Sequence, residues 1–220
     1  MLEIAPGVEL LPDLGQFVAF AIAGLALNLV PGADMTFVIA SAARGGTRSG
    51  LAAALGIGAG ALVHVLAAVV GLSALIASSQ TAFTVLKWVG AAYLLYIAIG
   101  LVRSGPPGRH GDAGPSVPAS PAAIFRKGAL VNILNPKVGM FFLAFLPQFV
   151  DADAAVPALQ IFALGLWFDL VGIAVNAIVA VGAAGAAARL AHVGWLTWAA
   201  KWFAATAMAA MALRLAADRR

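Results

Sequence analysis

The stretch Asn28-Leu29-Val30-Pro31-Gly32-Ala33-Asp34 interrupts an apolar run that extends from Gln16 to Ala43. As one continuous helix this run would be ~42 Å long, whereas the hydrocarbon core of a bilayer is ~30 Å thick. Proline removes a backbone donor and glycine loosens the next turn, so Pro31 and Gly32 free backbone groups in the middle of the run. In a bilayer such groups are tolerated where they are buried in protein or line a polar cavity. We therefore predict a broken helix with a binding site at the break.

A second apolar run, 128–150, is interrupted by Asn132-Ile133-Leu134-Asn135-Pro136-Lys137. The offset between the two prolines also separates His64 from Asp169. Lys87-Trp88 returns as Lys201-Trp202 at a slightly longer offset. This pattern indicates an internal duplication in which each half carries one broken helix.

The composition excludes an ordinary soluble domain. The chain has 220 residues, a mean hydropathy of +1.00 and only 10% charged residues, which is typical of a polytopic membrane protein. The net charge of +4 is explained by cytoplasmic loops better than by nucleic-acid binding. The chain has no cysteine, which excludes disulfides and thiol redox relays.

These observations predict an all-α integral membrane protein with six transmembrane helices. They are expected at about 16–43, 51–78, 83–102, 128–150, 156–184 and 195–215, with the first and the fourth broken. Residues 1–103 and 124–220 would form two three-helix repeats, joined by a flexible cytoplasmic linker at 104–123. Because each half has an odd number of helices, the second half inserts upside down relative to the first, giving inverted repeats.

Loop charges predict the orientation. Basic residues follow the first helix, flank the linker and follow the fifth helix, at Arg44, Arg48, Arg103, Arg109, Arg126, Lys127 and Arg189. Cytoplasmic loops are enriched in such residues, so both termini are expected outside. The acidic start of the chain suits this orientation and differs from a signal peptide, whereas the basic residues near the C-terminus fit it poorly.

Polar side chains close to the breaks are candidates for binding or coupling. Half-helix N-termini attract anions and opened carbonyls attract cations, so an amino acid suits both. Asp34 follows the first break, where a helix N-terminus favours its charge; this is equally a structural role. Lys137 has the wrong charge for the start of a helix and needs an anionic partner or water. The remaining candidates are Pro31, Gly32 and Pro136 of the breaks and the amides Asn28, Asn132, Asn135 and Asn176, which serve equally well to bond freed backbone.

His64 and Asp169 lie inside predicted helices at matching positions of the two halves. A carboxylate at mid-bilayer costs at least ~2.5 kcal/mol, so Asp169 is not expected to face lipid. His64 continues a stripe of small residues formed by Gly56 and Gly60, which lets another helix approach closely. Because imidazole titrates near neutral pH, the two residues are a candidate proton relay; the structural alternative for each is a hydrogen bond between helices.

These motifs resemble the lysine exporter (LysE) superfamily, and within it the homoserine/threonine exporter-like (RhtB) branch. The resemblance covers nearly the whole chain and rests on Pro31-Gly32-x-Asp34, Gly56-x-Gly58 with Gly60 and His64, Lys87 with Gly90-Ala91-Ala92-Tyr93-Leu94, Asn132 with Asn135-Pro136-Lys137, and Leu146-Pro147-Gln148-Phe149. It implies a six-helix inner-membrane exporter of amino acids or related metabolites, driven by the proton-motive force. The first break of the family usually reads Pro-Gly-Pro, and Ala33 here replaces the second proline, which puts the rigidity of this break in question.

The leading hypothesis is a secondary transporter of the bacterial inner membrane that exports a small neutral amino acid in exchange for protons. Its partners would be the amino acid, protons and the lipid bilayer, without nucleic acid or cofactor, and formation of a homo-oligomer is left open. The alternative is a divalent metal exporter with Asp34, Asp169 and His64 as ligands. An enzyme is not expected, because the sequence has neither a His-Glu-x-x-His nor a Gly-x-Ser-x-Gly motif.

Overall fold

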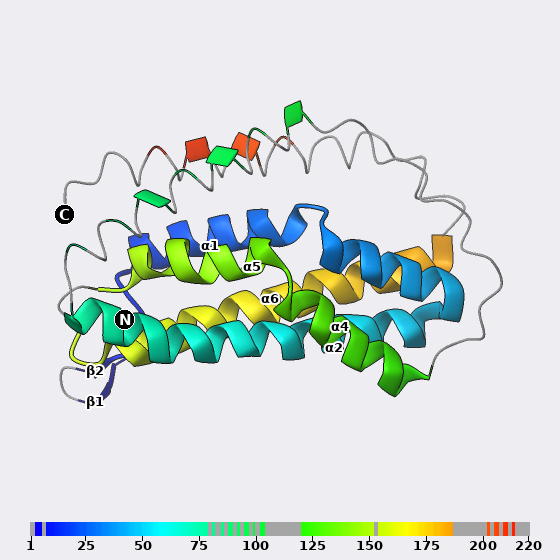
Figure 1. Cartoon of the computed structure of the whole chain (residues 1–220), viewed down its shortest axis with the longest axis horizontal. Coiled ribbons are helices and arrows are strands. Elements are labelled where there is room, and N and C mark those ends of the chain that lie inside the picture. The colour runs from blue at the N-terminus through cyan, green and yellow to red at the C-terminus, as the bar shows by residue number, and fades with distance from the viewer. Residues whose placement is uncertain are drawn as a thin grey trace.

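The computed structural model describes residues 3–5, 8–78, 120–151 and 154–186, with single positions between 81 and 103 and between 202 and 213. These residues form a bundle of long helices preceded by a small hairpin (Figure 1). The hairpin pairs β1 (Glu3–Ala5) with β2 (Val8–Glu9) and was not predicted, because strands this short carry too little pattern. The predicted helices at 83–102 and 195–215, and the linker up to residue 119, fall largely outside the described residues.

The first predicted break is confirmed. Helix α1 (Leu14–Leu29) begins at Asp13, whose side chain accepts a hydrogen bond from the Gln16 N–H at 3.0 Å. It ends at Val30, whose N–H is shared between the carbonyls of Ala26 and Leu27 at 3.2 Å each. Helix α2 (Ala33–Ser78) starts after Pro31-Gly32. The residues between the two helices therefore form a non-helical turn within the apolar run.

Helix α2 is in fact two limbs that reverse direction at two glycines. Gly45 (φ −128°, ψ 18°) and Gly46 (φ 69°, ψ −171°) have non-helical dihedrals, and the positive φ of Gly46 favours glycine. Residues 33–44 form the first limb and complete the first predicted helix, while residues 47–78 form the second limb. The connection between the helices predicted at 16–43 and 51–78 is thus shorter than expected, because helical geometry resumes directly after Gly46.

The second predicted break is also confirmed. Helix α4 (Pro121–Ile133) and helix α5 (Pro136–Met140) meet at Leu134 and Asn135, where the combined helix bends by 49°. A π-helical turn, η1 (Phe141–Phe145), and a 3-10 turn, η2 (Leu146–Phe149), continue α5. Helix α4 begins seven residues earlier than predicted, within the expected linker, because the Ser120 side chain caps it and Pro121 is favourable at its first position.

Helix α6 (Pro157–Ala186) matches the predicted fifth helix closely. By length and composition, Ala33–Gly71 and Pro157–Ala184 are apolar enough to cross a membrane, and α4 with its continuation is a third, bent candidate. The longest of these contains the Gly45-Gly46 reversal, and α1 alone is shorter than a full span. These findings support a helical membrane protein, while six spans and inverted repeats remain predictions.

Glycines set the packing around the second limb of α2. A Cβ on Gly60 would lie 2.8 Å from the Cβ of Asn132 and would also collide with the Ala129 carbonyl, and Gly56 faces the Phe125 backbone as closely. The predicted stripe of small residues therefore receives α4. On the other side of the second limb, Gly58 leaves space for Ile173 of α6.

An aromatic core joins α1, α6 and the segment from α5 to η2. Phe141 stacks on Phe168 with ring centroids 4.3 Å apart, and Phe20 packs edge-on against Phe149 at 5.4 Å. All four rings are buried. The core holds the segment that follows the second break against α1 and α6.

The two broken helices enter the bundle from opposite ends. In Figure 1, α1 starts beside the hairpin, whereas α4 starts at the other end, near the Gly45-Gly46 reversal. The exposed side chains of Arg44 and Arg48 flank this reversal, and those of Arg126 and Lys127 lie in α4. These four residues belong to the predicted cytoplasmic loops, and they lie at one end of the bundle.

Replacement of Gly60 by alanine is predicted to destabilise the protein, because the added Cβ collides with the backbone of α4. We expect a loss of about 1–3 kcal/mol, typical of overpacking. Gly71→Ala is the matched control: it lies in the same limb with open space around it, and alanine is the better helix former by about 1 kcal/mol. Thermal unfolding in detergent measures both, and equal stability of the two variants would contradict the close approach of α4.

Candidate functional site

Lys137 joins the second break to the first. Its ammonium donates hydrogen bonds to the backbone carbonyls of Val30 (3.1 Å) and Leu27 (3.4 Å), which lie at the C-terminal end of α1. Gly32 makes room for it, since a Cβ there would lie 3.3 Å from the lysine nitrogen. The C-terminal end of a helix carries a partial negative charge, so the ammonium stabilises the opened end of α1.

Asp34 makes the reciprocal connection from the first break to the second. It lies in the first turn of α2, where the helix dipole favours a carboxylate, and is 8% exposed. Its Oδ2 accepts hydrogen bonds from the side-chain amides of Asn132 (3.1 Å) and Asn135 (2.9 Å). Its Oδ1 is buried and has no partner among the described residues.

Asn135 serves both breaks at once. Its amide nitrogen binds Asp34, while its side-chain oxygen accepts a hydrogen bond from the Lys137 N–H at 3.0 Å and so caps α5. Pro136 occupies the first turn of α5, where its missing N–H has no cost. One buried asparagine therefore starts α5 and orients the carboxylate across the break.

His64 binds the end of α4. Its Nε2 lies 3.1 Å from the Asn132 backbone carbonyl, and because a carbonyl only accepts, Nε2 carries the proton. The ring stacks on Phe142 with centroids 6.1 Å apart, and Gly139 leaves space beside it. His64 thus holds Asn132, whose side chain in turn holds Asp34.

The two breaks meet at a polar region that we call the crossing, formed by Leu27, Val30, Asp34, Asn132, Asn135 and Lys137. Two opposite charges lie at this crossing without forming an ion pair. The Lys137 ammonium lies in the field of the Asp34 carboxylate, but the described contacts include no ion pair within 4.0 Å between them. An ammonium has three N–H donors, and two of those on Lys137 are used by carbonyls. Among the described residues, the crossing therefore leaves one donor on Lys137 and one acceptor on Asp34 without a partner.

The remaining predicted residues, Asn28, Asp169 and Asn176, lie on α6 or against it. Asp169 is 4% exposed, and its Oδ1 lies 3.3 Å from where a Cβ on Gly58 would be, so it faces the second limb of α2 and not lipid. No described residue donates a hydrogen bond to it. Asn28 donates to the Phe168 carbonyl at 3.3 Å, and the side-chain oxygen of the buried Asn176 has no partner among the described residues. His64 bonds to α4 through Nε2, and the contacts of the described residues include no hydrogen bond between His64 and Asp169.

Sequence reasoning overlooked Gln160. Its side chain is fully buried, its oxygen accepts a hydrogen bond from the Asp151 N–H at 2.8 Å, and its nitrogen has no partner among the described residues. The sequence did offer an indication of this role, because Gln160 is the one amide side chain in the apolar run at the start of α6. This residue fixes the loop before α6 and lies outside the crossing.

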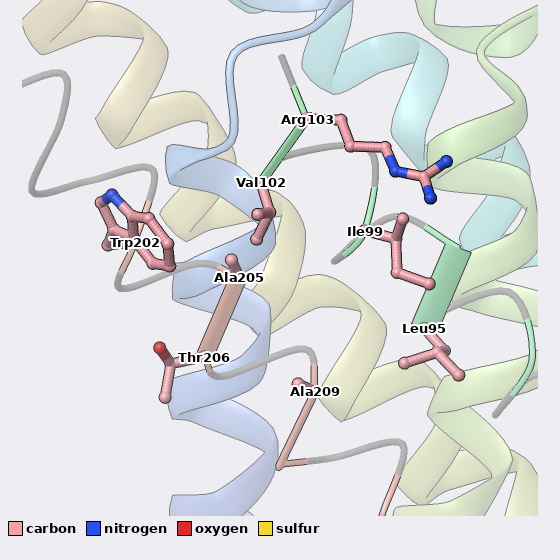
Figure 2. A pocket seen from close by; sticks show the side chains of 8 residues that line it. All are labelled: Leu95, Ile99, Val102, Arg103, Trp202, Ala205, Thr206 and Ala209. Carbon is pink, nitrogen blue, oxygen red and sulfur yellow. The ribbon is translucent and has the colours of Figure 1, made fainter. Parts of the chain in front are cut away.

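A pocket of about 390 Å³ lies elsewhere in the molecule (Figure 2). Its lining residues are Leu95, Ile99, Val102, Arg103, Trp202, Ala205, Thr206 and Ala209. None of the predicted site residues lines it. The pocket is mostly apolar and is separate from the polar crossing.

The ligand set proposed for metal export is not assembled. Asp34 binds Asn132 and Asn135, His64 binds a carbonyl, and Asp169 faces Gly58. Within the described part of the chain, no three His, Asp or Glu side chains converge as metal ligands. The divalent-metal alternative therefore has no structural support.

Long apolar helices with two opened turns that meet at buried charges define a helical membrane protein with a polar site at its broken helices. A family model for LysE-type translocators matches residues 25–219, and the chain belongs to this family. The resemblance read from the motifs is thereby confirmed.

Individual relatives agree with this assignment. An uncharacterised membrane protein of Vibrio cholerae is 34% identical over 63% of this chain and 67% of its own length, and another of Pseudomonas aeruginosa is 32% identical over 73% and 77%. A leucine efflux protein of Klebsiella pneumoniae is 29% identical over 71% of this chain and 73% of its own length. No solved structure shows significant similarity.

Replacement of Asn135 by alanine is predicted to destabilise the protein by more than the loss of a helix cap. The change removes the cap of α5, worth about 1 kcal/mol, and one donor to a buried carboxylate, worth about 1–3 kcal/mol. Ser120→Ala is the matched control, since Ser120 caps α4 at an exposed position. Thermal unfolding measures both, and a smaller or equal loss for Asn135→Ala would contradict the link to Asp34.

Proposed function

We propose that this protein exports neutral amino acids across the bacterial inner membrane and that the crossing of the two breaks holds the substrate. The observation that carries this proposal is the unused acceptor on Asp34 beside the unused donor on Lys137. The ammonium of an amino acid would bind Asp34 Oδ1, and its carboxylate would bind the Lys137 ammonium. The two charged groups of the substrate are opposite in sign, as are the two groups of the site.

The family supports export, and the named relatives support the substrate class. The chain belongs to a family of translocators, and similar proteins from Klebsiella and Salmonella are named leucine efflux proteins. Leucine has an uncharged side chain, so its only charges are the two that the crossing would bind. Neutral amino acids, small ones included, are therefore the proposed substrates.

Proton coupling is assigned to the two buried carboxylates. Asp34 and Asp169 are both buried in helices, where an ionised carboxylate without an opposite charge is costly. Protonation of Asp34 would weaken its attraction for the substrate ammonium, and protonation of Asp169 would remove a charge between α6 and α2. Exchange of a proton for the amino acid at this region would drive export with the proton-motive force.

The proposed orientation has the basic end of the bundle in the cytoplasm. The Gly45-Gly46 reversal and the start of α4 lie at this end with their exposed Arg and Lys residues (Figure 1). The start of α1 lies at the other end, which places the N-terminus outside. Entry of α1 and α4 from opposite ends is the arrangement expected of two inverted three-helix repeats.

Asp34→Asn and Asp169→Asn are each predicted to abolish leucine export while the protein remains inserted and folded. Efflux from proteoliposomes under an imposed pH gradient measures this directly. Asp13→Asn is the matched control, because Asp13 is an exposed cap of α1 and asparagine caps a helix equally well. Wild-type efflux in both buried variants would remove these carboxylates from the mechanism.

A further inference from the structure

We infer that Lys137 determines the charge selectivity of the crossing: its own ammonium fills the cation site at the end of α1, so amino acids with a second positive charge are rejected. This inference rests on the proposed function, because it assumes that amino acids bind at the crossing.

The opened end of α1 is a cation site built from backbone. The carbonyls of Leu27 and Val30 converge on one point, and the helix dipole adds negative potential there. An unfilled site of this kind would attract the ammonium or guanidinium of a substrate side chain. In this protein the point is occupied by the Lys137 nitrogen, at 3.4 Å and 3.1 Å from the two oxygens.

The lysine is held in place by its own segment. Its backbone N–H donates to the Asn135 side chain, and the next residue, Val138, is buried in the aromatic core. Gly32 leaves the space that the ammonium occupies. The cation is therefore a fixed part of the site.

The charge balance of the crossing follows from this arrangement. Asp34 contributes one negative charge and Lys137 one positive charge, which matches a zwitterion of zero net charge. A lysine or arginine substrate would bring an additional cation next to the fixed ammonium, where like charges repel. Asp169 faces Gly58 and shares no hydrogen bond with the described residues of the crossing, so the charges in contact there are those of Asp34 and Lys137.

The experiment measures equilibrium binding of leucine and of lysine to purified protein in detergent. We expect the wild type to bind leucine at least about tenfold more tightly than lysine. Lys137→Gln retains a donor for the carbonyls and removes the charge, so the preference for leucine over lysine is expected to fall about tenfold or more. Lys127→Gln, an exposed lysine on α4, is the matched control and is expected to keep the wild-type preference.

A competition measurement on the wild type needs no variant and applies even if Lys137→Gln does not fold. Norleucine has nearly the length of lysine but no side-chain charge, so it is expected to displace leucine where lysine does not. Equal competition by lysine and norleucine, or an unchanged preference in folded Lys137→Gln, would overturn the inference. Absence of any amino-acid binding by the wild type would instead contradict the proposed function.

Discussion

Backbone opened inside a bilayer has no water to bond with, so the carbonyl and N–H groups freed near Pro31 and Pro136 need partners from the protein itself. Each break supplies those partners to the other. Lys137 bonds the carbonyls at the end of α1, and the Asn132 and Asn135 amides bond the Asp34 carboxylate at the start of α2. The two breaks are therefore stable only as a pair, and the rest of the bundle serves to bring them together.

The close approach depends on residues that have little chemistry of their own. Gly60 lets α4 lie against the second limb of α2, and the same contact sets the height of Asn132 beside Asp34. The stacked rings of Phe141 and Phe168 hold the segment after the second break against α6. Small and aromatic side chains thus supply the rigidity that a site of two opened turns lacks.

Local chemistry was enough to predict the breaks, α6 and the small-residue stripe, because Pro-Gly, Asn-Pro and glycine periodicity act over a few residues. It was not enough to predict which groups pair. Lys137 was expected to need an anionic partner or water, and the structure gives it backbone carbonyls more than 100 residues away. His64 was matched with Asp169 by repeat position, whereas packing places it against Asn132. The hairpin has strands too short to carry a pattern, and the π turn at Phe141–Phe145 lies in the aromatic core, whose contacts no short pattern records.

The central claim is that the crossing of the two breaks is where an amino acid binds. An experimental structure of the protein with bound leucine tests it most directly. The account predicts the leucine ammonium at Asp34 Oδ1 and its carboxylate at the Lys137 ammonium, with the Asn132 and Asn135 amides still on Asp34. Leucine bound away from both breaks, for instance in the apolar pocket beside Arg103, would contradict it.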